Sequence, residues 1–321
     1  MSVGNQKTTM FRYFCCSEVY PIMKKFFSQT AFLAIVSALL WSSAFVGVKI
    51  GLKYHTPLQF AGVRFLLSGL ILLPVIHDIR RYRKEVAANS GFVCLVAFLQ
   101  IVLQYSFFYL GVNLVPASIS AMIVGSGPLF VALVAHFSIP DDHLNTRKIG
   151  SIILGVTGVA IITLGRSNLT SGGGIALLGV AYLILNNITS GISNVVIARK
   201  NSSVSPMILT SSSLIAGGIS LIMISLPFEG IPVKSFPLEY FIALAWLSFL
   251  SAAAITIWTT LLRRPEVKVS ELNFWKFLIP VSGAILSWMI LPNESPDLVS
   301  ISGMVFIGFA LILLNKNRFY N

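Results

Sequence analysis

Charged residues are scarce in this sequence. They make up 11% of its 321 residues, whereas 55% are hydrophobic and the mean hydropathy is +0.84. A water-soluble domain carries about 25% charged residues, so this chain has too few charges to cover a solvent-exposed surface. The hydrophobic residues form blocks of about 20, the length that a helix needs to cross roughly 30 Å of hydrocarbon. The composition therefore predicts an all-α polytopic membrane protein.

Cysteine, histidine and embedded acidic residues are also too few for several kinds of chemistry. The three cysteines form no disulfide or zinc pattern, because Cys15 and Cys16 are adjacent and Cys94 lies in an apolar block. The four histidines lack metal-binding spacing, and all eleven acidic residues lie near predicted helix ends or in loops. These absences disfavour a cation exchanger built on a buried carboxylate. They also disfavour a membrane enzyme for lipid-linked substrates, and we expect no cofactor.

The net charge of +12 does not indicate a nucleic-acid partner, because the basic residues lie in short runs between the apolar blocks. Ten transmembrane helices are predicted, at residues 30–52, 57–77, 91–115, 116–139, 149–165, 174–198, 206–227, 238–262, 270–291 and 298–315. We divide the third from the fourth because a run over 91–139 is too long for one span.

Lysine and arginine predict the orientation of these spans. If the amino terminus is inside, 17 of the 23 basic residues fall in inner segments and three in outer segments. Both termini are therefore predicted to be cytoplasmic. Short loops and few cysteines favour a bacterial inner membrane over a eukaryotic membrane. Residues 1–29 are predicted as an N-terminal tail, and 316–321 as a C-terminal tail; Cys15 and Cys16 would also fit juxtamembrane palmitoylation.

The two halves of the sequence, 30–165 and 174–315, resemble two copies of one five-helix unit. The matching residues recur at nearly constant offsets along the sequence. An offset of 152 relates Ser118, Pro128 and Ala132 to Ser270, Pro280 and Ala284. An offset of 149 relates Pro57 and Gly69 to Pro206 and Gly218, and one of 153 relates Gly150 and Gly155 to Gly303 and Gly308. A unit with an odd number of spans forces the second copy to be inverted. Inverted repeats are typical of carriers whose solute site lies near the midplane.

Polar side chains in the middle of predicted spans are candidates for lining a solute pathway, because they are costly in lipid. The clearest pattern is a stripe of polar residues at a spacing of four in the sixth helix. The substrate-binding candidates are Trp41, Ser42, Arg64, Gln100, Gln104, Tyr105, Tyr182, Asn186, Ser190, Asn194, Thr256, Trp258, Asn273 and Lys276. The alternative is hydrogen bonding between helices, which is the better reading for a single serine or threonine.

Two basic residues and two prolines inside predicted spans each allow a structural or a functional interpretation. Arg64 and Lys276 either extend to the headgroups or pair structurally, or else they counter a carboxylate or phosphate of the solute. Pro128 and Pro280 lie at the centres of the fourth and ninth helices, where they predict kinks that act as hinges or only shape packing. The fifth and tenth helices, apolar and glycine-bearing, are predicted as scaffold or as the face of a homodimer.

Several stretches resemble the EamA-type branch of the drug/metabolite transporter superfamily over residues 30–315. They are Trp41-Ser42-Ser43-Ala44-Phe45, Arg64-Phe65-Leu66-Leu67, Tyr109-Leu110-Gly111, Pro116-Ala117-Ser118, Pro128-Leu129-Phe130, Lys276-Phe277-Leu278-Ile279-Pro280 and Asn293-Glu294. The resemblance implies a carrier of two inverted halves around a central cavity. One departure is that the family often has a glutamate after the fourth helix, where this chain has Asp141-Asp142.

The leading hypothesis is therefore a secondary carrier in the lipid bilayer for a small polar organic solute that is amino-acid-like or a related metabolite. Export is what the resemblance implies; the residues do not indicate a direction. A lipid or amphiphile flippase, or a multidrug exporter, shares the predicted architecture and is the alternative. A channel is disfavoured because no stretch resembles a selectivity filter.

Overall fold

The computed structural model describes residues 5–138, 146–164, 174–200, 202–230, 235–267 and 269–314. Within these ranges the chain forms helices joined by short connections, without a β-strand. In chain order the helices are α1 Asn5–Leu52, α2 Pro57–Ile76, α3 Ile79–Ala88, α4 Ser90–Val96, π-helix η1 Ala97–Leu103, α5 Gln104–Leu114, α6 Ala117–Gly125, α7 Gly127–Ser138, α8 Thr146–Leu164, α10 Gly174–Arg199, α11 Pro206–Glu229, α12 Leu238–Leu262, α13 Val269–Phe274, 3₁₀ helix η2 Trp275–Phe277, α14 Leu278–Ile290 and α15 Leu298–Leu314. The predicted C-terminal tail and Asp141-Asp142 lie outside the described residues.

The apolar helices are long enough for a multi-pass membrane protein. Within the described residues, seven segments have the length and composition of a span: Gln29–Leu52, Pro57–Ile76, Ser90–Leu114, Ala117–Ser138, Gly174–Arg199, Pro206–Glu229 and Leu238–Leu262. Three apolar helices are shorter: Ile149–Leu164, Leu278–Ile290 and Leu298–Leu313. Large apolar side chains such as Phe228 and Leu298 point outward, 81% and 85% exposed, as expected for contact with lipid. The all-α membrane class is confirmed, and the count of ten spans remains a prediction.

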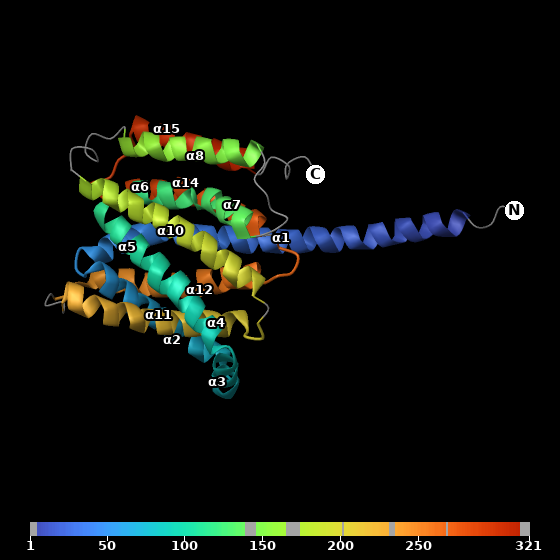
Figure 1. The fold of residues 1–321 in the computed structure, drawn as a ribbon, viewed down its shortest axis with the longest axis horizontal. Coiled ribbons are helices and arrows are strands. Elements are labelled where there is room, and N and C mark those ends of the chain that lie inside the picture. Colours follow the sequence, from blue (N-terminus) through green and yellow to red (C-terminus); the bar gives the residue numbers. More distant parts are fainter. Residues whose placement is uncertain are drawn as a thin grey trace.

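The first helix is longer than its membrane segment. α1 begins at Asn5 and thus runs through most of the predicted N-terminal tail, while its apolar segment begins only at Gln29. Figure 1 shows the first part of α1 projecting well beyond the other helices. The sequence analysis predicted a tail over residues 1–29 and assigned no helix to it.

Two pairs of helices approach closely at glycines, on opposite sides of the bundle. α8 and α15 form a separate layer at one side (Figure 1), where a Cβ atom on Gly303 would lie 2.7 Å from the carbonyl oxygen of Gly158. On the other side, α2 crosses α11, and a Cβ atom on Gly218 would lie 2.9 Å from the carbonyl oxygen of Gly62. Small residues permit such backbone contact between membrane helices. The expected homodimer through α8 and α15 stays a prediction.

Three helices between these pairs are interrupted near mid-length. The fourth apolar segment divides into α6 and α7 at Ser126, two residues before Pro128. The ninth divides into α13, η2 and α14, with Pro280 three residues after the 3₁₀ turn. Proline lacks an N–H group and clashes with the carbonyl four residues earlier, so both breaks have the cause predicted from the sequence. The third segment contains π-helix η1 over Ala97–Leu103, which the sequence analysis did not predict.

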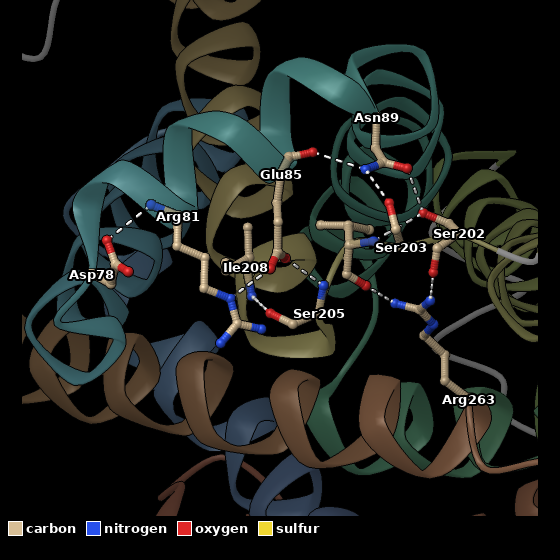
Figure 2. A network of polar contacts seen from close by, with 10 residues as sticks. Asp78, Arg81, Glu85, Asn89, Ser202, Ser203, Ser205, Ile208 and Arg263 are labelled. Atoms are coloured by element: carbon tan, nitrogen blue, oxygen red, sulfur yellow. Dashed lines mark hydrogen bonds and ion pairs between the residues drawn. The ribbon is translucent and has the colours of Figure 1, made fainter.

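A polar network joins α3 to the second half of the chain at one end of the bundle (Figure 2). The Glu85 carboxylate accepts hydrogen bonds from Ser205 N at 2.7 Å and Arg81 Nε at 2.6 Å. Asn89 exchanges hydrogen bonds with Ser202 and Ser203, and the Arg263 guanidinium donates to the carbonyls of Ser202 and Val204. Burial raises the pKa of the Glu85 carboxyl, but its hydrogen bonds with Ser205 and Arg81 outweigh burial and hold that pKa below its usual value. We call these residues the α3 joint.

Two carboxylates join the halves at the other end of the bundle. Glu229, the last residue of α11, accepts hydrogen bonds from the backbone N–H groups of Leu58 and Gln59, each at 3.0 Å. Glu294, beyond α14, accepts from the N–H groups of Ala117 and Ser118 at 2.6 and 2.8 Å. Both carboxylates therefore satisfy N–H groups that begin a helix and lack an intrahelical partner.

The close crossing of α2 and α11 predicts the effect of one added methyl group. We expect Gly218→Ala to destabilise the protein, because the new Cβ would lie 2.5 Å from Leu66 N and 2.9 Å from Gly62 O, both backbone atoms. Overpacking of this kind costs about 1–3 kcal/mol. Gly308→Ala is the matched control, since no atom lies within 4 Å of its added Cβ. Thermal unfolding of the purified variants in detergent measures the difference, and equal melting temperatures would contradict the proposed backbone contact.

Candidate functional site

A polar cavity lies inside the bundle where the three interrupted helices meet. Together with its opening to solvent, the space between its side chains amounts to about 740 Å³. Its lining comprises Trp41, Ala44, Phe45, Arg64, Gln100, Gln104, Tyr105, Phe108, Val124, Gly127, Asn186, Asn187, Ser190, Asn194, Ile255, Trp258, Lys276 and Ile279. Among the residues that the structure describes, no aspartate, glutamate, histidine or cysteine lines the cavity. The cavity is thus equipped to bind a solute through cations, amides and aromatic rings.

The structure brings ten of the fourteen sequence candidates together in this lining. They are Trp41, Arg64, Gln100, Gln104, Tyr105, Asn186, Ser190, Asn194, Trp258 and Lys276. They come from α1, α2, η1, α5, α10, α12 and η2, so seven separate elements converge on one space. Their role in binding a solute remains a prediction.

The other four candidates lie outside the lining. Ser42 packs α1 against α14, donating to Ala38 O at 2.8 Å and accepting from Ser282 Oγ at 2.7 Å. The ring of Tyr182 stacks on Phe107, with their centroids 6.1 Å apart. The hydroxyl of Thr256 is buried without a hydrogen-bond partner among the described residues.

The fourth, Asn273, supports the lining from behind. Its side chain is fully buried, donates to Val269 O at 2.8 Å and accepts from Asn194 Nδ2 at 3.0 Å. This contact orients the amide of Asn194, which does line the cavity. Asn273 is therefore better described as a positioning residue than as a residue that touches solute.

Arg64 is held firmly by neighbouring helices. Its side chain is 1% exposed, and its Nε atom donates to Leu247 O at 3.2 Å and to Ser251 Oγ at 2.9 Å. Its Nη1 atom donates to the Tyr109 hydroxyl at 2.7 Å, and the guanidinium carbon lies 4.9 Å from the ring centroid of Phe65. Arg64 points into the bundle instead of extending to the headgroups. The guanidinium cross-links α2 to α5 and α12 as well as lining the cavity.

Lys276 has a different environment. Its side chain is 9% exposed, and the Nζ atom lies 4.7 Å from the ring centroid of Trp258 and 5.4 Å from that of Trp41. The two indoles are themselves in edge contact, with centroids 5.0 Å apart. Such cation–π contacts stabilise a desolvated ammonium group. Among the described residues, however, the Lys276 ammonium has neither a carboxylate partner nor a hydrogen-bond acceptor.

The amides of α10 form the remaining polar wall. Asn187 Nδ2 donates to Ile123 O at 2.7 Å, a carbonyl at the break between α6 and α7, and its amide lies 3.1 Å from that of Asn186. Ser193 Oγ lies 3.5 Å from Gln104 Oε1, which links the same helix to α5. The wall therefore contacts two of the interrupted helices.

Sequence reasoning missed part of the lining. The candidates did not include Asn187, which directly follows Asn186 in the sequence, although its amide is the one that reaches the broken helix. The apolar residues Phe45, Phe108 and Ile279 also line the cavity. The sequence carries no signal that distinguishes them from the many aromatic and aliphatic residues that fill the core.

The helix breaks lie at the edge of the cavity. Gly127, directly after the break in the fourth segment, lines it through its backbone. The ring of Pro280 packs against Gly125, where an added Cβ would lie 2.2 Å from Pro280 Cδ. The two interrupted helices thus touch one another through the residues that break them. Whether Pro128 and Pro280 act as hinges remains a prediction.

Comparison with known proteins agrees with this multi-pass helical architecture. The sequence profile of the EamA-like transporter family matches residues 28–164 and again 177–316, so the chain belongs to this family. It is a membrane transporter for small solutes, as the sequence resemblance implied.

Relatives over nearly the whole length carry transporter names. The chain is 27% identical over 293 residues to the uncharacterized transporter YvbV of Bacillus subtilis (strain 168), covering 90% of this chain and 92% of that protein. It is 23% identical to a probable amino-acid metabolite efflux pump of Escherichia coli (strain K12), over 88% and 91% of the two chains. A solved crystal structure shares the fold, with a TM-score of 0.63 at 15% identity over 92% and 99% of the chains.

The contrast between the two buried cations predicts opposite effects on stability. Arg64→Met should lower the melting temperature by several degrees, because the acceptors on Tyr109, Ser251 and Leu247 lose their donor, at about 1–3 kcal/mol for each group left unsatisfied. Lys276→Met should leave it unchanged or raise it, because no described acceptor loses a partner. Thermal unfolding of the purified variants in detergent measures both. An equal loss of stability in both variants would contradict the two environments described.

Proposed function

We propose that this protein is a secondary carrier that moves a small polar organic solute across the membrane by alternating access. The observation that carries the proposal is the cation- and amide-lined cavity enclosed by apolar helices. A purely structural membrane protein gains nothing from such a cavity, because buried polar groups are costly. Relatives named as amino-acid metabolite efflux pumps support export and an amino-acid-like or related solute.

The proposed architecture is ten spans in two inverted halves, 30–165 and 174–315. The double match of one family profile supports this division, because each copy covers one half of the chain. Five spans per copy would invert the second copy in the membrane. Alternating access in such carriers is a rocking of one half against the other around a central site.

Contacts between α2 and α11 support a two-fold relation between the halves. An added Cβ on Gly69 would lie 2.9 Å from Ser211 O, and one on Gly218 would lie 2.9 Å from Gly62 O. The sequence offset of 149 relates Gly69 to Gly218 and also Gly62 to Ser211, so each contact is the counterpart of the other. The packing of α1 on α12 has a counterpart in the packing of α10 on α5.

Both ends of the bundle carry polar contacts that join the halves, and we propose that these contacts open alternately. The α3 joint would close the cytoplasmic end, and the Glu229 and Glu294 contacts the outer end. This assignment rests on the distribution of basic residues, which favours a cytoplasmic location of both termini. The breaks near Pro128 and Pro280 would serve as the hinges between these states.

Alternating access predicts that one cavity position reacts from both sides of the membrane. In a background with Cys15, Cys16 and Cys94 changed to serine, we expect Ser190→Cys to be modified by an impermeant thiol reagent in right-side-out and in inside-out vesicles, because Ser190 lines the cavity. Mass spectrometry of the labelled protein measures the extent.

The matched control is Ser42→Cys, since Ser42 is fully buried at the contact of α1 and α14 and lies outside the lining. It should remain unlabelled in both preparations. Labelling of the Ser190→Cys variant from one side alone, under every condition and solute tried, would overturn alternating access.

Loss of the α3 joint should favour the state open to the cytoplasm. Glu85→Ala removes the acceptor for Ser205 N and Arg81 Nε. When it is combined with Ser190→Cys, labelling of the new thiol from the inner side should rise about tenfold or more, the factor for about 1.5 kcal/mol from one hydrogen bond to a charged group. Arg83→Ala, on an exposed position of the same helix, is the control and should leave labelling unchanged. If Glu85→Ala also leaves labelling unchanged, the joint does not close that end.

A further inference from the structure

The Lys276 ammonium is a charged group of the cavity whose donors have no acceptor among the described residues. The group is nine-tenths buried, lines the cavity and contacts the faces of Trp41 and Trp258. A lysine ammonium has three donors, and no described residue supplies an acceptor for them. Buried charges are normally paired or hydrogen-bonded. The donors of Lys276 are therefore available to an anion or another acceptor that enters the cavity.

We propose that Lys276 binds the carboxylate of the transported solute, so that the carrier takes small organic carboxylates. This inference rests on the proposed carrier function, since it names the class of solute for the same cavity. The contacting group is the Lys276 ammonium, which would form charge-assisted hydrogen bonds with the carboxylate. Amides of Asn186, Asn194 and Gln104 line the same space and can bind polar substituents of the solute.

The second cation of the lining, Arg64, is held in place by neighbouring helices. The guanidinium of Arg64 already donates to Leu247 O, Ser251 Oγ and the Tyr109 hydroxyl, which fix it in the contact of three helices. Lys276 is not held in this way, and one ammonium group matches one carboxylate.

The lining offers few groups that would bind a cationic group of the solute. The lining contributed by the described residues contains no carboxylate. The indole faces of Trp41 and Trp258 are the surfaces that would otherwise attract an ammonium group, and Lys276 already lies against both. The expected order of preference is therefore carboxylate anion, then the zwitterion of the same skeleton, then the amine.

The test uses matched solutes that differ only in charge. Each of several carbon skeletons is supplied as a 2-oxo acid, as the corresponding amino acid and as the decarboxylated amine, for example 4-methyl-2-oxopentanoate, leucine and 3-methylbutylamine. We expect at least one oxo acid to raise the melting temperature of the purified protein and to move in proteoliposomes. The corresponding amino acid should stabilise the protein and be transported more weakly, and the corresponding amine should have no effect.

The variants assign the effect to Lys276. We expect Lys276→Gln to raise the concentration of oxo acid needed for half-saturation about ten- to hundredfold, which corresponds to the loss of a hydrogen bond to a charged group. Lys276→Arg should retain part of the binding. Lys49→Gln is the matched control, because Lys49 is a half-buried cation of α1 that does not line the cavity. Unchanged melting temperatures of the ligand-free variants would show that they fold.

The outcomes separate this inference from the carrier function. Transport of an amine or zwitterion that is insensitive to Lys276→Gln would overturn the carboxylate assignment and leave the carrier intact. Stabilisation by phosphatidylglycerol alone, with no solute transported, would overturn both and favour a lipid flippase. Absence of binding and transport across all three charge classes would likewise overturn both.

Discussion

The structure depends on one constraint, which is that backbone N–H and carbonyl groups within hydrocarbon must find partners inside the protein. Intact helices satisfy this rule. A broken helix is tolerated where other protein groups or a polar cavity provide partners for the backbone groups that the break leaves unpaired. In this chain the breaks at Ser126, at the 3₁₀ turn Trp275–Phe277 and at the π-helix Ala97–Leu103 all lie around one space. The amide of Asn187 hydrogen-bonds to a carbonyl at the first break. The position of the cavity thus follows from where the helices are interrupted.

Two cations share this space but are stabilised differently. Arg64 is surrounded by oxygen acceptors from α5 and α12, so its charge is dispersed over hydrogen bonds that also hold these helices together. Lys276 is surrounded by aromatic faces, which stabilise charge without consuming its donors. The hydrogen bonds of Arg64 hold it in the contact of three helices, whereas the donors of Lys276 have no acceptor among the described residues. Arg64 therefore contributes to the fold, and the proposal assigns recognition of the solute to Lys276.

The sequence predicted those parts of the structure that follow from periodicity and from backbone chemistry. The spacing of Asn186, Ser190 and Asn194 placed them on one face of a helix, and the interior prolines predicted both breaks. It could not determine which face of α1 meets the cavity, because neighbouring residues such as Trp41 and Ser42 point about 100° apart and both suit a polar pathway. The carboxylate contacts that join the two halves at the bundle ends link residues more than 100 positions apart, and no local pattern encodes them.

The contacts at the ends of the bundle differ in kind from those along its sides. Glu85, Glu229 and Glu294 each accept hydrogen bonds from N–H groups at the start of a helix in the other half. A hydrogen bond of this sort contributes only about 1–3 kcal/mol, because water replaces both partners when it breaks. The glycine crossings of α2 with α11 and α8 with α15 bury backbone against backbone, and water in the membrane interior cannot replace that contact. The proposed alternation would therefore separate the halves at their ends while these two crossings remain packed and act as the axis of the movement.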